Sequence, residues 1–340
     1  MDQYLITLTG EPILAYLVMA VVPLLVILPY VIVALYIELK MSAHMQDRLG
    51  PMRTGKWHGV GQPFADMLKL LQKEDIIPRA ADKKLFIFAP YLVFMGAYAA
   101  FAAIPICSEY IGAPIDVGVF YVVAVSALVV VAILMGGWAS NNKWSMLGAM
   151  RSAAQIISYE IPTAMCILVA VMIAGTMDLQ KINHLQEGGI FNWIVWQTPP
   201  FGFIAFFLYF VGSLAEVNRT PFDIPEADSE LVAGYQTEYS GMRFAMFYLA
   251  EYTNMFAVSA IASALFLGGW TSPFGSTMSG PIWGVFWFVT KAMSLVLLQM
   301  WLRWTLPRVR VDQLMYICWK VLVPFAFVNM LAAGLWLVLK

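Results

Sequence analysis

Eight long apolar runs constrain the fold of this chain more than any other feature. Each is long enough to supply the roughly 20 helical residues that cross a hydrocarbon core of about 30 Å. The runs are unbroken, whereas the strands of a membrane barrel alternate apolar and polar residues. We therefore predict an all-α integral membrane protein, a bundle of about eight transmembrane helices with long cytoplasmic loops. The runs cover residues 13–37, 85–107, 117–138, 155–175, 193–215, 244–269, 281–303 and 315–339.

The composition and the positions of the positive charges support this prediction. The chain is 61% hydrophobic and 12% charged, whereas a soluble domain has roughly 25% charged residues. Of the 20 Lys and Arg residues, 16 fall in or beside the connections after the first, third, fifth and seventh runs. Positive residues accumulate on the cytoplasmic side, so we expect the loops at about 38–84 and 216–243 to be cytoplasmic and both termini to lie on the opposite side. Residues 1–340 are interpreted as a single polytopic domain.

The loop after the fifth run is strongly acidic. Between residues 216 and 238 it carries six acids against one base, Arg219. Clustered carboxylates raise one another's pKa by repulsion between like charges. This pattern indicates proton or cation chemistry. The six acids are Glu216, Asp223, Glu226, Asp228, Glu230 and Glu238.

Several ionisable residues fall inside or at the ends of the apolar runs. They are Glu160, Glu216, Glu251, Lys291 and Lys320. An ionisable side chain at the centre of a membrane helix costs about 2.5–3.5 kcal/mol on insertion scales, so each is a functional candidate. Two interpretations remain open: these residues line a proton path, or they form buried ion pairs, for instance glutamate with lysine, that fix helix packing.

The other connections allow more than one interpretation. Apolar residues recur at helical spacing over 64–73, which predicts a helix that lies in the membrane interface or an ordinary surface helix packed on the bundle. Residues 139–154 are predicted to be a polar link, with Trp144 as an interfacial anchor. The arginines around Pro307 either follow the positive-inside rule or hold acids of the 216–238 loop.

Motifs for metals and nucleotides are absent from the sequence. The three cysteines are isolated, without the paired spacing of zinc or iron–sulfur sites, and the three histidines are scattered. No Walker A, dinucleotide or metalloprotease motif occurs. We expect no metal site and no cofactor motif in the chain itself.

Three segments together resemble one family, the membrane component of respiratory complex I that is called the H subunit in bacteria and subunit 1 in mitochondria. The first combines Gln46, Arg48, Gly50 and Pro51 with residues 61–75. The other two are residues 215–252, and residues 302–315 with Trp319 and Lys320. The resemblance covers nearly the whole chain, and its second segment is long and highly specific.

The resemblance implies a subunit that joins the hydrophilic arm to the membrane arm and helps to form a quinone chamber. It implies quinone as substrate, with FMN and iron–sulfur clusters only in partner subunits. The implied partners are peripheral quinone-site subunits, antiporter-like membrane subunits and lipid, with no nucleic acid, in a bacterial inner membrane or an equivalent energy-transducing membrane. The implied acidic path is Glu160, Glu216, Asp223, Glu226, Asp228, Glu230 and Glu251, and the implied basic positions near the chamber or the acidic loop are Arg48, Arg219 and Arg303.

The chain departs from the family pattern at two positions. Leu39 follows Glu38 where the family usually has arginine, which removes a basic group near the quinone passage, and Met52 follows Gly50 and Pro51 where it usually has asparagine. A related membrane subunit of an energy-converting hydrogenase or ferredoxin-linked complex is an alternative that needs no quinone. An independent transporter is a further alternative, but inverted repeats with broken helices are not found. The acids inside the runs argue against a purely structural anchor.

Overall fold

The computed structural model describes residues 12–225, 228–275, 277–278 and 280–339, and the elements in these ranges are all helical. This confirms the predicted all-α fold. The longer helices are α2 (Pro12–Met45), α3 (Gln62–Gln72), α4 (Lys83–Ala99), α5 (Gly118–Ala139), α6 (Lys143–Ala174), α9 (Phe201–Glu216), α11 (Gly241–Phe266), α12 (Pro281–Thr305) and α14 (Val323–Leu339). Short helices are α7 (Leu179–Leu185), α8 (Ile194–Gln197), α10 (Asp228–Leu231) and α13 (Val311–Tyr316), and a π-helix (Ile317–Leu322) joins α13 to α14.

Seven helices in the described ranges are long and apolar enough to cross a membrane. The remaining predicted span, at 193–215, is divided into α8 and the 16-residue α9. Pro199 and Pro200 separate the two pieces. Proline has no backbone N–H to donate and clashes with the preceding turn, so two consecutive prolines favour an interruption of the helix at this point.

The predicted polar link at 139–154 is wrong in extent, because α6 begins at Lys143 and runs for 32 residues. The Asn142 side chain accepts a hydrogen bond from the Trp144 N–H and so caps this helix. Ser145 and Ser152 are polar but fully buried against the rest of the bundle. Hydropathy alone therefore predicts a helix start that is too late in the chain. Polar residues that face the protein interior lower the mean hydropathy, so the first turns of α6 do not look like part of a membrane span.

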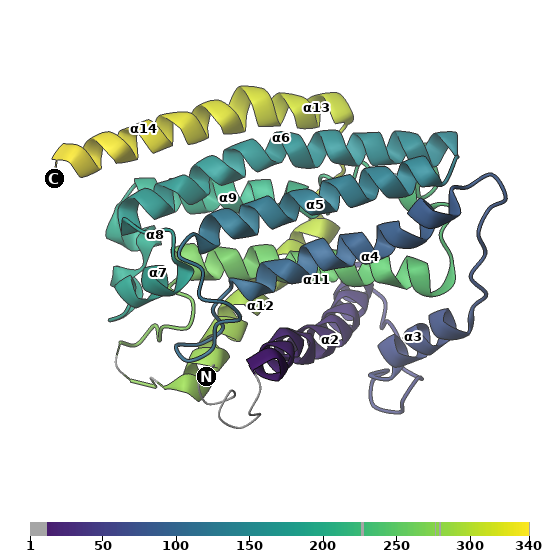
Figure 1. Ribbon diagram of the computed structural model, residues 1–340, viewed down its shortest axis with the longest axis horizontal. Coiled ribbons are helices and arrows are strands. Elements are labelled where there is room, and N and C mark those ends of the chain that lie inside the picture. Colours follow the sequence, from purple (N-terminus) through teal and green to yellow (C-terminus); the bar gives the residue numbers. More distant parts are fainter. Residues whose placement is uncertain (1–11, 226–227, 276, 279, 340) are drawn as a thin grey trace.

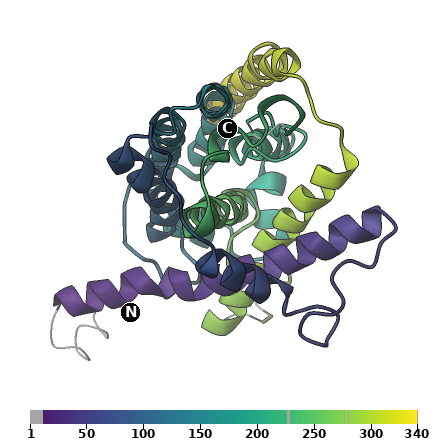
Figure 2. The same cartoon turned by 90° about the vertical axis from the view of Figure 1, so that its right-hand side faces the viewer.

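The long helices lie side by side, and their connections collect at two ends (Figure 1). The connections before α4, α6, α11 and α13 lie at the same end as α3, which we call the α3 end. Helices α7 and α8 lie at the opposite end, the α7 end. Helix α11 is central and the most buried of the spanning helices. Figure 2 shows α2, in purple, crossing one edge of the bundle at a steep angle to the other helices, with α14, in yellow, at the opposite edge.

Helix α3 lies outside the bundle with its apolar stripe exposed. It packs against α2 and α11. Phe64, Met67, Leu68 and Leu71 are all exposed, whereas Asp66 on the polar face is half-buried. An ordinary surface helix would bury its apolar stripe against the bundle, so this arrangement favours a helix in the membrane interface.

Helices α6 and α9 approach closely because of a glycine. A Cβ added at Gly212 of α9 would lie 2.3 Å from Thr163 Cγ2 of α6. Glu160 of α6 and Glu216 of α9 lie within about one turn of these two residues. The glycine therefore sets the spacing of the two helices that carry these acids.

We predict that Gly212→Ala destabilises the protein by about 1–3 kcal/mol, the usual cost of overpacking. Thr163→Ser removes the methyl group that clashes and keeps the hydroxyl that donates to the carbonyls of Tyr159 and Glu160, so the double variant should recover stability. The measurement is the thermal midpoint of the detergent-solubilised protein. Gly118→Ala is the control, because its new Cβ would lie 3.8 Å from its nearest neighbour. A single Gly212→Ala variant as stable as the parent would contradict the packing.

Candidate functional site

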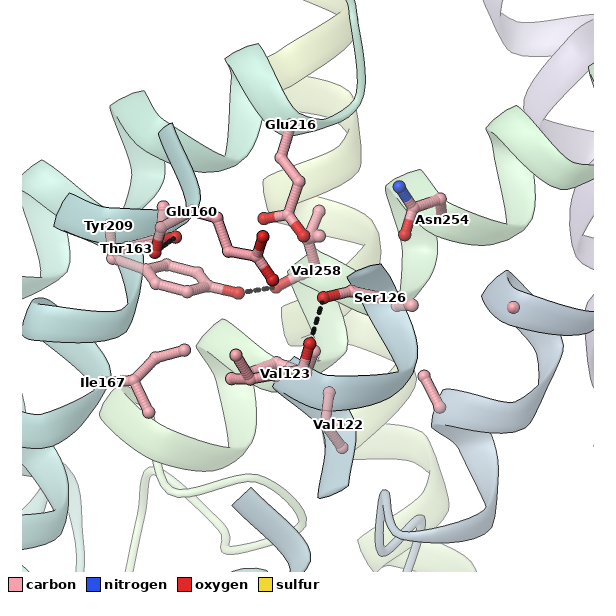
Figure 3. A pocket seen from close by; sticks show the side chains of 14 residues that line it. Val122, Val123, Ser126, Glu160, Thr163, Ile167, Tyr209, Glu216, Asn254 and Val258 are labelled. Carbon is pink, nitrogen blue, oxygen red and sulfur yellow. Dashed lines mark hydrogen bonds between the residues drawn. The ribbon is translucent and has the colours of Figure 1, made fainter. Parts of the chain in front are cut away.

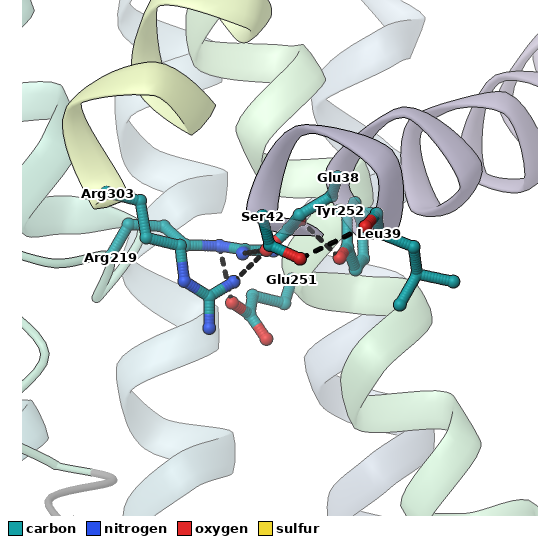
Figure 4. A network of polar contacts seen from close by, with 7 residues as sticks. All are labelled: Glu38, Leu39, Ser42, Arg219, Glu251, Tyr252 and Arg303. Atoms are coloured by element: carbon teal, nitrogen blue, oxygen red, sulfur yellow. Dashed lines mark hydrogen bonds and ion pairs between the residues drawn. The ribbon is translucent and has the colours of Figure 1, made fainter. Parts of the chain in front are cut away.

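A network of charged side chains lies where three helices meet the acidic loop (Figure 4). Helix α2 contributes Glu38, α11 contributes Glu251 and Tyr252, α12 contributes Arg303, and the loop after α9 contributes Arg219. The network thus joins segments from four parts of the chain. Sequence analysis identifies Arg219, Glu251 and Arg303 as site residues but does not include Glu38, because Glu38 directly follows the first apolar run, where a loop is expected to start.

Arg219 lies between two carboxylates. Its Nη1 lies 2.8 Å from Glu38 Oε1, and its Nε lies 2.7 Å from Glu251 Oε1. Glu38 also accepts a 2.5 Å hydrogen bond from the Tyr252 hydroxyl at Oε2 and contacts Arg303 Nη1 through Oε1. The Arg219 guanidinium lies 4.7 Å from the centre of the Tyr252 ring. Two guanidinium groups and two carboxylates therefore balance in charge.

The two arginines of the network differ in how deeply they are buried. The Arg219 side chain is 3% exposed, whereas the Arg303 side chain is 28% exposed. A buried charge is tolerated only when its partners replace the water that it has lost. Arg219 is therefore the structural centre of the network, and Arg303 is its open edge.

A second pair of acids faces a small cavity (Figure 3). The carboxylates of Glu160 and Glu216 point toward one another across it, with Ser126, Tyr209 and Asn254 in its lining. The Tyr209 hydroxyl is already engaged, since it donates to the Val258 carbonyl at 3.0 Å. The cavity has a volume of about 30 Å³. A cavity needs about 10–15 Å³ to hold one water molecule.

The two groups of acids differ in their partners. Within the residues that the structure describes, the carboxylates of Glu160 and Glu216 form no ion pair and no hydrogen bond to protein. The cavity between them has room for about two water molecules. Carboxylates bridged by water can exchange protons, whereas Glu38 and Glu251 are held by arginine.

The other predicted site residues lie elsewhere. Asp223 lies 3.1 Å from Arg308 Nη2, and Glu230 lies 2.6 Å from Arg151 Nη1. The first pair confirms that an arginine after the seventh apolar run holds an acid of the 216–238 loop. Asp228 is the first residue of α10, and Glu226 lies outside the described residues. Arg48 is exposed, and its guanidinium contacts the side chain of Gln46.

The intramembrane lysines do not pair with glutamates in the described part of the chain. Lys291 donates to backbone carbonyls, and Lys320 is exposed with its ammonium 4.7 Å from the centre of the Tyr316 ring. The interpretation of buried ion pairs is therefore confirmed for Glu251, although its partner is Arg219 and not a lysine. No group of three or more His, Cys, Asp or Glu side chains that could hold a metal occurs among the described residues.

We predict that Arg219→Ala destabilises the protein by about 3–5 kcal/mol, because it leaves two buried carboxylates without their partner. Arg303→Ala should cost less, since the lost guanidinium is partly solvated and Glu38 keeps its bonds to Arg219 and Tyr252. The measurement is the thermal midpoint of the solubilised protein and the amount that accumulates in membranes. Equal losses for both variants would contradict the central position of Arg219.

Comparison with known proteins identifies the family. A family model described as NADH dehydrogenase matches residues 17–334. The chain is 54% identical over 336 residues to the NADH-quinone oxidoreductase H subunit of Chlorobium luteolum, which covers 96% of this chain and 90% of that relative. It is 53% identical over 336 residues to the corresponding H subunit of Chlorobaculum tepidum, covering 96% and 93% of the two chains.

A more distant relative is the NADH-quinone oxidoreductase H subunit of Anaeromyxobacter dehalogenans, 46% identical over 351 residues, which covers 97% of this chain and 84% of that relative. The bacterial relatives and the seven apolar helices confirm the predicted location, a multi-pass protein of the bacterial inner membrane. The chain belongs to the NADH dehydrogenase family, and nearly its whole length is similar to the H subunit of bacterial NADH-quinone oxidoreductases.

Proposed function

We propose that this chain is the membrane subunit of a proton-pumping NADH:quinone oxidoreductase that helps to form the quinone chamber and couples quinone reduction to proton translocation. The observation that carries the coupling role is the pair of carboxylates, Glu160 and Glu216, facing a water-sized cavity without a basic partner in the described residues. Unpaired acids inside a membrane bundle are costly, and proton relays are their best-known use.

Quinone passes, in this proposal, along the open edge of the arginine network. Arg303 is the more exposed of the two arginines, so its guanidinium is available to a polar quinone headgroup. Arg48, in the connection between α2 and α3, is a second candidate contact for the headgroup. The electron donors, FMN and iron–sulfur clusters, belong to peripheral partner subunits.

Reduction of a quinone beside the network changes the charge that Glu38 and Arg219 experience. Arg219 contacts both Glu38 and Glu251. Negative charge that develops on the quinone repels Glu38 and attracts the nearby guanidinium groups, so the balance of Arg219 between Glu38 and Glu251 shifts. A change in the chamber is thereby passed to α11.

Helix α11 connects the network to the cavity. Glu251 belongs to the network, and Asn254, three residues later on the same helix, lines the cavity beside Glu160 and Glu216. Side chains three residues apart lie on the same face of a helix. A shift at Glu251 therefore reaches the cavity over one turn, and a proton moves between Glu216 and Glu160 through cavity water toward antiporter-like neighbouring subunits.

The remaining acids of the loop have a supporting role in this proposal. Asp223 and Glu230 are held by Arg308 and Arg151, so they fix the loop that carries Arg219 and supply negative charge at the entrance of the path. Glu226 and Asp228 complete the same acidic segment in the sequence.

The assignment is tested on membranes solubilised gently and separated on a native gel. We expect the chain in a complex of several subunits that reduces quinone with NADH and is blocked by a quinone-site inhibitor. Migration as a monomer or small homo-oligomer would overturn the assignment. Activity with ferredoxin or hydrogen and without quinone would instead favour the membrane subunit of an energy-converting hydrogenase or ferredoxin-linked complex.

We predict that Glu216→Gln lowers inhibitor-sensitive NADH:quinone reductase activity by about tenfold or more, since loss of a proton-transferring group commonly costs at least that. Assembly should stay normal, because the Glu216 carboxylate holds no ion pair among the described residues. The measurement combines quinone reduction, proton uptake by vesicles and the amount of complex on a native gel. Glu109→Gln is the control, an exposed acid outside the bundle helices. Full activity with normal pumping in Glu216→Gln would overturn the proposed path.

A further inference from the structure

Lys291 is a buried cation that the proposed proton path does not use. It lies within α12 and is 8% exposed. Its ammonium donates to three backbone carbonyls, those of Leu267 at 2.7 Å, Gly269 at 3.0 Å and Thr271 at 2.8 Å. These carbonyls belong to the segment that follows the last residue of α11, far from the acidic loop in the sequence.

The geometry fits the protonated form of Lys291. A lysine ammonium has three N–H donors, and all three find a carbonyl. A neutral amine has only two, so deprotonation would leave one carbonyl of this buried site without a donor, at a cost in free energy. The ring of Trp193 completes the site, with its centre 4.2 Å from the ammonium, a favourable position for a cation over an aromatic face.

Two glycines give the turn after α11 the backbone conformation that directs its carbonyls at the ammonium. Gly268 has φ +74° and Gly269 has φ +48°, a region that favours glycine. A Cβ on Gly268 would lie 2.6 Å from Trp193 Nε1, and a Cβ on Gly269 would lie 2.1 Å from Asn183 Oδ1. Only glycine lets this turn approach its neighbours closely enough to direct its carbonyls at the ammonium.

The same turn ends the central helix of the bundle. The last carbonyls of a helix lack partners within the helix, and the negative end of its dipole favours a cation. Gln186 Nε2 donates to the carbonyls of Ala264 at 3.1 Å and Leu265 at 3.3 Å, and Lys291 donates to that of Leu267. Side chains from α12 and from the segment after α7 therefore close the end of α11.

We propose that the carbonyls of Leu267, Gly269 and Thr271, together with the Trp193 ring, form a binding site for a primary ammonium group, and that Lys291 occupies it as a tethered ligand. In this role Lys291 is a positioning residue. In the protonated form that the three carbonyls fit, it fixes the α7 end of α11, the helix that carries Glu251 and Asn254. It does not take part in moving protons.

The site is tested by emptying it and adding a free ligand. Lys291→Ala retains Cβ and removes the part of the side chain that propylammonium reproduces. In the whole complex, we expect at least about tenfold less native-gel complex to survive a fixed heating step, the loss expected from even one charge-assisted hydrogen bond. Excess propylammonium chloride should restore survival. Tetramethylammonium has the charge without N–H donors and 1-propanol lacks the charge, so neither should do so.

Lys320→Ala is the matched control, since Lys320 is also an intramembrane lysine but is exposed and lies over Tyr316. It should change survival little and show no response to propylammonium. Equal survival of Lys291→Ala and the parent, or equal rescue by all three additives, would overturn the proposal.

A second pair of variants covers the case in which Lys291→Ala yields no complex. Lys291→Arg keeps a cation with N–H donors, and Lys291→Met keeps the length of the side chain without either. We expect complex to accumulate with arginine and to be largely lost with methionine. Equal accumulation of the two, or more complex with methionine, would show that the site does not require a cation. Both readouts are independent of quinone reduction, so they do not depend on the proposed path.

Discussion

The rest of the site depends on one buried guanidinium. Arg219 is 3% exposed and lies between the carboxylates of Glu38 and Glu251. In a low-dielectric interior none of these charges is tolerated alone, so α2, α11 and the loop after α9 have to meet at this point. The steep crossing of α2 brings Glu38 to the network (Figures 1 and 4). Apolar packing, such as that of Tyr30 of α2 on Phe256 of α11, accompanies this charge balance where the segments converge.

The network also separates the acids by what they can do. Glu38 and Glu251 are held by arginine, as are Asp223 and the more exposed Glu230. Glu160 and Glu216 face a cavity with room for water. A carboxylate held by a guanidinium stabilises structure and responds to nearby charge, whereas one that faces water can give up or accept a proton. The structure thus separates acids that are paired with arginine from acids that face a cavity, and the proposed proton path uses the second group.

Helix α11 is secured in different ways at its two halves. Near the α3 end, carboxylates and guanidinium groups balance one another around Glu251. At the α7 end, three backbone carbonyls and an aromatic ring surround the Lys291 ammonium. The first arrangement responds to a change in the charge around it. The second places a single ammonium among backbone carbonyls whose positions the turn fixes. A helix that is responsive at one end and fixed at the other can pass a shift at Glu251 to Asn254 without moving as a whole.

The sequence by itself determined the helical membrane fold. In lipid, the N–H and C=O groups of a spanning segment can form hydrogen bonds only with one another, and long apolar runs identify the segments to which this constraint applies. It also identified Glu160, Glu216 and Glu251, because charges in or beside apolar runs are costly and therefore conspicuous, whereas Arg219 and Arg303 were indicated by the family resemblance. Only the tertiary structure decided which charges meet. Arg219 and Arg303 reach Glu38 across 181 and 265 residues of chain, and no local spacing records such a contact. For the same reason the sequence could not assign carbonyl partners to Lys291 or extend α6 back to Lys143, since both depend on groups that folding alone brings together.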